Sequence, residues 1–146
     1  MASGTVSAAI EDYILANWTQ TPLVFENEPT NTAGQPWPPA TPAAFVNVAF
    51  TGNTYGQQSV GASVQAQNRW DEEGLILADV LVPIGQGSRG ARTYAKQFCD
   101  LFRGQVLLSG SLEFLDASIG LGVKSDSYSG NYFAIPVDIE WRHMAA

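Results

Sequence analysis

Few residues in this chain could carry out nucleophilic or acid–base chemistry. The sequence holds one cysteine, Cys99, and one histidine, His143. A nucleophile needs a base within hydrogen-bond reach and a third group that orients the base. Cys99 lies beside the apolar stripe of an expected helix, where a small hydrophobic role is typical, and His143 lies near the C-terminus, which we expect to fray. These positions disfavour a Cys–His or Ser–His site.

Paired carboxylates are the remaining route to acid–base chemistry, because Asp and Glu total 14. Asp71, Glu72 and Glu73 are contiguous and precede Gly74. An acid–base pair also needs a concave pocket, and nothing in the sequence points to one. We therefore predict a solvated tip or bend over residues 71–74. An enzyme that uses paired carboxylates stays an alternative, which an acid-to-amide scan would test.

A glycine-rich segment spans residues 85–90, Gly-Gln-Gly-Ser-Arg-Gly, ahead of an expected helix. Such a turn can bind an anion through free backbone N–H groups, but this one lacks the lysine of a phosphate-binding loop. A strand-to-helix turn that needs glycine geometry is the better interpretation. Since the chain has one cysteine and one histidine, most metal sites built from those residues are excluded. We expect no catalytic, cofactor-binding or metal-binding residues.

Length and composition limit the class of protein further. A chain of 146 residues suits one domain, residues 1–146. Charged residues make up 14%, and the net charge of −7 argues against a general nucleic-acid-binding patch. No stretch has the length of a membrane span, and the N-terminus lacks the features of a signal peptide.

Hydrophobic periodicity predicts an α+β fold, with two α-helices packed on one face of a mostly antiparallel β-sheet. The helices are expected at 5–18, ended by Thr21-Pro22, and at 89–103, ended by Gly104. The expected strands are 23–25, 43–51, weak signals at 57–70, a central strand at 75–82 covered on both faces, signals within 105–121, and 132–142. Residues 51–56 have the composition of a turn. Pro136 suggests an edge position or a bulge for the last strand.

Four tryptophans suggest surfaces used for assembly. Trp18 and Trp141 fit core faces, whereas Trp37 lies in a proline-rich loop over residues 26–42 and Trp70 lies in an expected hairpin. Aromatic side chains outside a core are enriched at protein interfaces. Residues 39–42 fit a minimal polyproline ligand without a flanking basic residue, so we prefer an arm that packs on its own domain or on a neighbouring subunit.

The order of these segments resembles the tail terminator-like proteins of long-tailed phages and gene transfer agents. The resemblance covers nearly the whole chain. Its most specific parts are residues 75–87, a strand followed by Pro-x-Gly-x-Gly and then a helix, and the final strand at 135–142, Ile-Pro-Val-x-Ile-x-Trp-Arg.

The resemblance implies a structural virion protein without a reaction or cofactor. Six copies would form a homohexameric ring at the head-proximal end of the tail, assembled in the host cytoplasm. The ring would stop polymerisation of the tail tube protein and then join a head-completion connector, and DNA would pass through its centre without specific binding. The net charge of −7 per chain separately suggests a negative lumen that would repel DNA phosphates. No membrane is involved. The arm at 28–42 and a protruding hairpin at 52–73 would reach neighbours. The residues expected at these interfaces are Trp37, Pro38, Tyr55, Trp70, Asp71, Glu72 and Glu73.

Two other classes stay open besides the enzyme. A tail-tube or head-tail connector protein would share the composition, but a tube protein polymerises without limit. A small ligand- or peptide-binding module would be monomeric or dimeric, and it would tolerate loss of residues 28–42 without any effect on particles.

Overall fold

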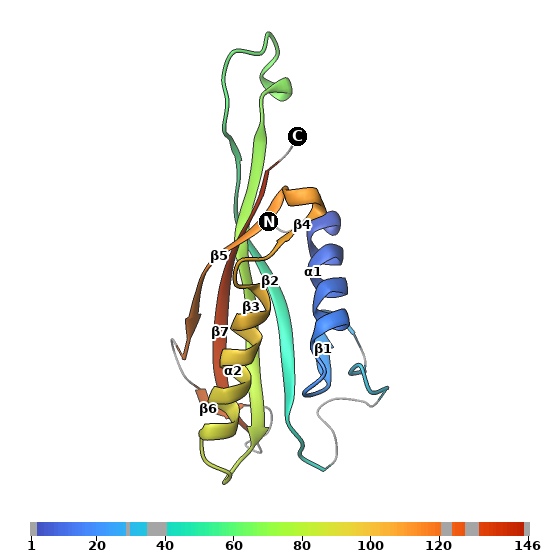
Figure 1. Ribbon diagram of the computed structural model, residues 1–146, viewed down its shortest axis with the longest axis vertical. Coiled ribbons are helices and arrows are strands. Elements are labelled where there is room, and N and C mark those ends of the chain that lie inside the picture. The colour runs from blue at the N-terminus through green and yellow to red at the C-terminus, as the bar shows by residue number, and fades with distance from the viewer. Residues whose placement is uncertain (1–2, 29, 35–40, 121–123, 128–131, 145–146) are drawn as a thin grey trace.

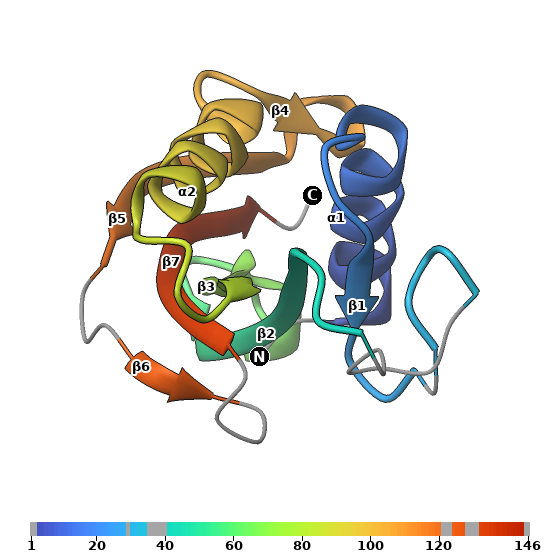
Figure 2. The same cartoon turned by 90° about the horizontal axis from the view of Figure 1, so that it is seen from below.

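The computed structural model describes residues 3–28, 30–34, 41–120, 124–127 and 132–144. Two helices lie on the same side of one curled sheet, and a long hairpin extends beyond the body (Figures 1 and 2). The predicted α+β architecture is thus confirmed. In chain order the elements are α1 (Gly4–Asn17), β1 (Leu23–Phe25), β2 (Phe45–Gln57), η1 (Gln65–Gln67), β3 (Trp70–Pro83), α2 (Arg89–Phe102), β4 (Val106–Leu107), η2 (Leu108–Gly110), β5 (Leu112–Ile119), β6 (Lys124–Ser127) and β7 (Tyr132–Met144).

The strands of the described residues pair in the order β1-β2-β3-β7-β5-β4, and β6 pairs with β7 beside the end of β5. Only β1 and β2 are parallel; every other pairing is antiparallel. Strand β3 therefore lies between β2 and β7, as predicted for the apolar segment 75–82. Strands β3 and β7 pair over thirteen residues and form the centre of the sheet.

Both helices are held by the apolar stripes that the sequence predicts. Helix α1 begins at Ser3, whose hydroxyl accepts a hydrogen bond from the Val6 amide at 3.4 Å. Helix α2 begins after Ser88, whose side chain makes no capping hydrogen bond. Gly104 follows α2 with φ 71°, the left-handed conformation that ends many helices.

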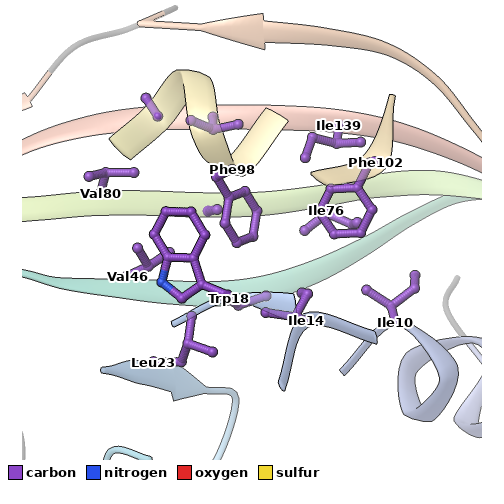
Figure 3. Close-up of a cluster of buried hydrophobic side chains, with 14 of the residues drawn as sticks. Ile10, Ile14, Trp18, Leu23, Val46, Ile76, Val80, Phe98, Phe102 and Ile139 are labelled. Carbon is purple, nitrogen blue, oxygen red and sulfur yellow. The ribbon is translucent and has the colours of Figure 1, made fainter. Parts of the chain in front are cut away.

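The main core lies between the helices and the sheet (Figure 3). Trp18, just after α1, packs edge-on against Phe98 of α2, with ring centroids 5.5 Å apart. Beneath them lie Val46 and Ile76 from the central strands. Trp18 and Trp141 are both buried, which confirms their predicted core positions.

The opposite face of the sheet is covered less completely. A second buried cluster lies at one end of it and consists of Val24, Phe45, Leu81, Tyr132 and Ala134. Farther along β3 the same face carries Leu75 and Leu77, which are only half-buried. The expectation that this strand is covered on both faces is therefore correct at one end and wrong over the middle.

Pro136 does not mark an edge strand, because β7 has β3 on one side and β5 and β6 on the other. The carbonyl of Pro136 accepts a hydrogen bond from the Gly120 amide at 2.9 Å. The nitrogen of a strand residue points to the same edge as its carbonyl, so the missing N–H faces the break between β5, which ends at Ile119, and β6. A central strand thereby accommodates proline without losing a ladder bond at this position.

Candidate assembly interface

The hairpin formed by β2 and β3 outgrows the rest of the sheet (Figure 1). Strand β7 pairs with β3 as far as Asp71 and Met144, and β2 pairs with β3 one residue farther, to Gln57 and Trp70, so the part that extends beyond the sheet is residues 58–69. The segment 58–69 then connects the two strands. The predicted protruding hairpin is therefore present, but its turn lies at 58–69 and not at 51–56 or 71–74.

Strands β2 and β3 approach each other closely at the base of the hairpin. The register of β2 shifts between Gly52 and Thr54, and such a bulge bends and twists a strand. Opposite it, a Cβ on Gly74 would lie 2.1 Å from the carbonyl oxygen of Thr51 and 2.6 Å from the Trp141 ring. Only glycine lets β2 and the indole come this close to β3.

The tip of the hairpin is ordered by polar contacts. The Gln58 amide donates to the carbonyl of Arg69 at 2.7 Å, and the Arg69 amide donates to the hydroxyl of Ser59 at 2.7 Å. The Ala62 amide donates to the Asn68 side chain at 3.0 Å. These bonds cross the loop and give it a defined shape although it has no buried residue of its own.

Apolar side chains stand out on this polar tip. Val60 is 89% exposed, Val64 is 51% exposed and Tyr55 is 54% exposed. The Tyr55 ring lies 5.7 Å from that of Trp70, whose indole N–H donates to the carbonyl of Gln65 at 3.3 Å. The structure thus brings two of the expected interface residues together and adds the two valines, which sequence reasoning read only as weak strand.

The expected acidic turn is instead part of β3. Asp71 is 1% exposed, and its Oδ2 accepts hydrogen bonds from Arg142 Nη2 at 3.0 Å and Nε at 3.3 Å. Its Oδ1 lies 3.3 Å from Arg69 Nε, out of hydrogen-bond geometry. The hydrogen bond that Arg142 donates to Asp71 is the main cause that raises the pKa of Arg142. Asp71 therefore fastens the foot of the hairpin and is not a free surface carboxylate.

Its two neighbours differ in exposure. Glu72 is buried, and its Oε2 accepts a hydrogen bond from the Ser3 amide at 2.9 Å. Its Oε1 lies 3.9 Å from Nδ1 of His143, so His143 lies in β7 and is not at a frayed end. Glu73 is about half-exposed and lies 3.8 Å from Arg142 Nε. The predicted solvated turn is wrong because the last strand supplies partners for these acidic side chains. The adjacent basic residues Arg142 and His143 were the feature of the sequence that could have indicated this pairing.

The remaining expected interface residues, Trp37 and Pro38, lie outside the described residues. Among the described residues there is no group of three or more metal-ligating side chains. Neither described helix has the length and apolar character of a membrane span. The glycine-rich segment forms the turn between β3 and α2, as its interpretation as a strand-to-helix turn predicts.

A groove of about 380 Å³ lies between α2 and β5. Its lining includes Leu115 and Ile119, both exposed, and the half-buried Cys99. Burial raises the pKa of the Cys99 thiol to about 11. A thiol in this state is a poor nucleophile at neutral pH, which fits the small hydrophobic role expected for Cys99.

Comparison with known proteins supports the fold. No family model matches the chain, and no curated protein matches it. One solved structure, whose name carries no functional description, is similar to 97% of this chain over 94% of its own length, with a TM-score of 0.61 and 20% sequence identity. At that identity the likeness concerns the fold alone, and the fold is the two-helix, curled-sheet architecture described above.

Proposed function

We propose that this protein is a structural virion protein of the tail terminator type. It forms a ring, expected to be a homohexamer, at the head-proximal end of a tail tube. The ring stops tube polymerisation and provides the joining surface for the head connector, with a passage for DNA. The proposal rests on the sequence resemblance over residues 75–87 and 135–142, and the α+β fold is compatible with it.

The hairpin tip is the observation that carries the proposal furthest. It extends beyond the body with exposed Val60, Val64 and Tyr55 on a scaffold of hydrogen bonds. Apolar side chains that stay in water do not stabilise a monomer. They contribute binding free energy when a partner covers them. We assign the tip to the contact with the tail-tube end.

The foot of the hairpin supports this role mechanically. Asp71 links β3 to Arg142 of β7, and Glu72 links β3 to the first turn of α1. A contact surface that is fixed before binding loses less conformational entropy when it binds. The tip is thus a preorganised element and not a loose loop.

If the ring has a negatively charged DNA passage, Asp71 and Glu72 do not supply that charge. Asp71 and Glu72 are buried within a single chain, so they do not contribute exposed charge to a lumen. Glu73 and the other exposed carboxylates of a chain with net charge −7 remain available. A negative wall would repel phosphates and let the duplex slide.

The test is to change the tip while leaving the body intact. A V60S/V64S variant should fold and form rings like the wild type but lose capping of purified tail tubes. The matched control is Val106→Ser, because Val106 is a 56% exposed valine on the body, and it should cap normally. Capping is measured by electron microscopy as the fraction of tubes closed by a ring.

Other outcomes would redirect the assignment. If the wild type grows into open tubes, the protein is a tail-tube protein. If it remains a monomer with or without tubes and loss of its gene leaves tails of normal length joined to heads, the terminator proposal is refuted. A binding module would then be the better interpretation.

A further inference from the structure

The face of the sheet opposite the helices carries leucines and carboxylates side by side on β3 and β7. Asp79 lies opposite Pro136, Leu77 lies opposite Asp138, and Leu75 lies opposite Glu140. Side chains that face each other across antiparallel strands point to the same side, so these residues share one surface. We call Leu75, Leu77, Asp79, Asp138 and Glu140 the uncovered sheet face. It combines two half-buried leucines with three carboxylates.

The described cation next to this face on β7 has other partners. Arg142, the next outward-facing residue of β7, is already paired with Asp71 and Glu73 at the foot of the hairpin. Within the described part of the chain, Asp138 and Glu140 have no cationic side chain within ion-pair distance. Asp138 and Glu140 thus place acidic groups beside the two leucines, and such a surface favours a basic partner.

Helix α2 presents a surface of the opposite sign. Its apolar stripe is buried against the sheet, and Arg89, Arg92 and Lys96 lie on the exposed side at spacings of three and four. Arg103 follows on the same side, so four of the seven basic residues of the chain lie in this segment. Lys96 is paired with Asp100 at 2.7 Å, but Arg89 and Arg92 have no acidic partner among the described residues. We call Arg89, Arg92 and Lys96 the basic helix face.

The two faces point away from each other. Helix α2 covers one side of β3 and β7 (Figures 1 and 2), and the uncovered sheet face is the other side of the same strands. One copy can therefore use both faces at once, each with a different neighbour. Such head-to-tail contacts generate a ring when the rotation between copies closes.

We propose that the basic helix face of one copy docks on the uncovered sheet face of the next copy. Arg89 and Arg92 would then meet Asp138 and Glu140, and Leu75 and Leu77 would be covered. This inference deepens the proposed function, because it names the surfaces through which ring subunits meet. It also differs from the tip contact, so the two can fail separately.

The test uses two variants that each damage one face. R89E/R92E reverses the helix face and D138K/E140K reverses the sheet face; each should weaken self-association at least about 10-fold in analytical ultracentrifugation. A mixture of the two restores opposite charges at both contacts. The unmutated sheet face of the first variant meets the unmutated helix face of the second, and the two reversed faces meet each other. The mixture should therefore associate in alternation, although each variant alone does not. Association of the wild type should also weaken from about 0.05 to 0.5 M salt.

A matched control and a rescue distinguish this contact from a general effect of charge. E11K/D12K makes the same change in charge as D138K/E140K, but on α1 and away from both faces, and it should associate like the wild type. The chain with all four reversals should regain association, because both faces have changed sign. Thermal melting curves check that every variant is folded.

Three results would overturn the inference. The first is wild-type association that neither face variant weakens; rings would then form through other surfaces and the proposed function would stand. The second is a mixture of the two variants that associates no better than either variant alone. The third is a wild type that remains monomeric up to about 1 mM, because the two faces then do not bind each other; a ring that forms on the tube would keep the proposed function.

Discussion

The hairpin tip and the helix-covered core are built on opposite principles. The core buries large apolar side chains, with Phe98 at 0% exposure between two layers. The tip buries none of its residues from 58 to 67 and depends on hydrogen bonds between polar groups. Apolar burial supplies most of the stability of a fold, whereas an exposed hydrogen bond supplies little. The comparison indicates that the core provides most of the stability of the fold. The tip contributes little stability, so its residues can be used to contact a partner.

The largest expected effect comes from the core. Phe98→Ala removes a ring that packs against Trp18 and Phe102, so the free energy of unfolding should fall by about 4 kcal/mol. Chemical denaturation measures the change. Val60→Ala at the tip, made in parallel, should change it by less than about 0.5 kcal/mol. Equal losses at both positions would refute the division between core and tip.

The next effect is expected at the junction between body and hairpin. Gly74→Ala forces a methyl group against the Thr51 carbonyl and the Trp141 ring, and overpacking of this kind should destabilise the fold by about 3 kcal/mol. Gly56→Ala is the control, because its nearest neighbour is the flexible Gln58 side chain at 3.5 Å. A mild effect at Gly74 would mean that the hairpin base yields easily.

A smaller effect is expected at the foot. Asp71→Asn leaves Arg69 and Arg142 without their buried carboxylate, and because both arginines are partly exposed the loss should be about 2 kcal/mol. Glu73→Gln should cost less than about 0.5 kcal/mol, since Glu73 is about half-exposed. Hydrogen exchange at residues 54–57 should accelerate in the Asp71 variant and remain unchanged in the Glu73 variant.

The last prediction compares the reactivity of a thiol in the body with that of a thiol at the tip, and it involves the smallest change in stability. Burial raises the pKa of Cys99 to about 11, so at pH 8 only about one thiol in a thousand is ionised, and alkylation should be slow and should accelerate as the pH approaches 11. In a Val60→Cys variant the new thiol at the exposed tip should react at the rate of a free cysteine. Mass spectrometry counts both adducts, and equal rates at the two thiols would contradict the comparison.

The sequence predicts the core region well because its signals are local. The apolar stripes of α1 and α2 and the alternation in 75–82 each follow from burial on one face, and Ser3 and Gly104 mark helix ends with their own backbone preferences. These elements keep their predicted places because nothing distant competes with their local pattern.

The hairpin could not be placed in this way. Residues 51–57 and 71–73 are polar and turn-like in composition, yet they are strand because each meets a partner across the sheet. Asp71 and Arg142 are separated by 71 positions in the sequence. Hydrophobic periodicity is a local signal and does not predict a contact between residues so far apart. The valines of the tip lack a pattern too, so their exposure on an ordered loop became evident only in three dimensions.

The ties at the hairpin foot also set an order of events during synthesis. Ser3 leaves the ribosome long before Arg142, but the two bind adjacent residues of β3, Glu72 and Asp71. Since β7 lies between β3 and β5, the middle of the sheet is incomplete until the C-terminal strand has emerged. Both Asp138 and Glu140 lie on that strand as well. A growing polypeptide therefore lacks the proposed docking surface until β7 has been translated.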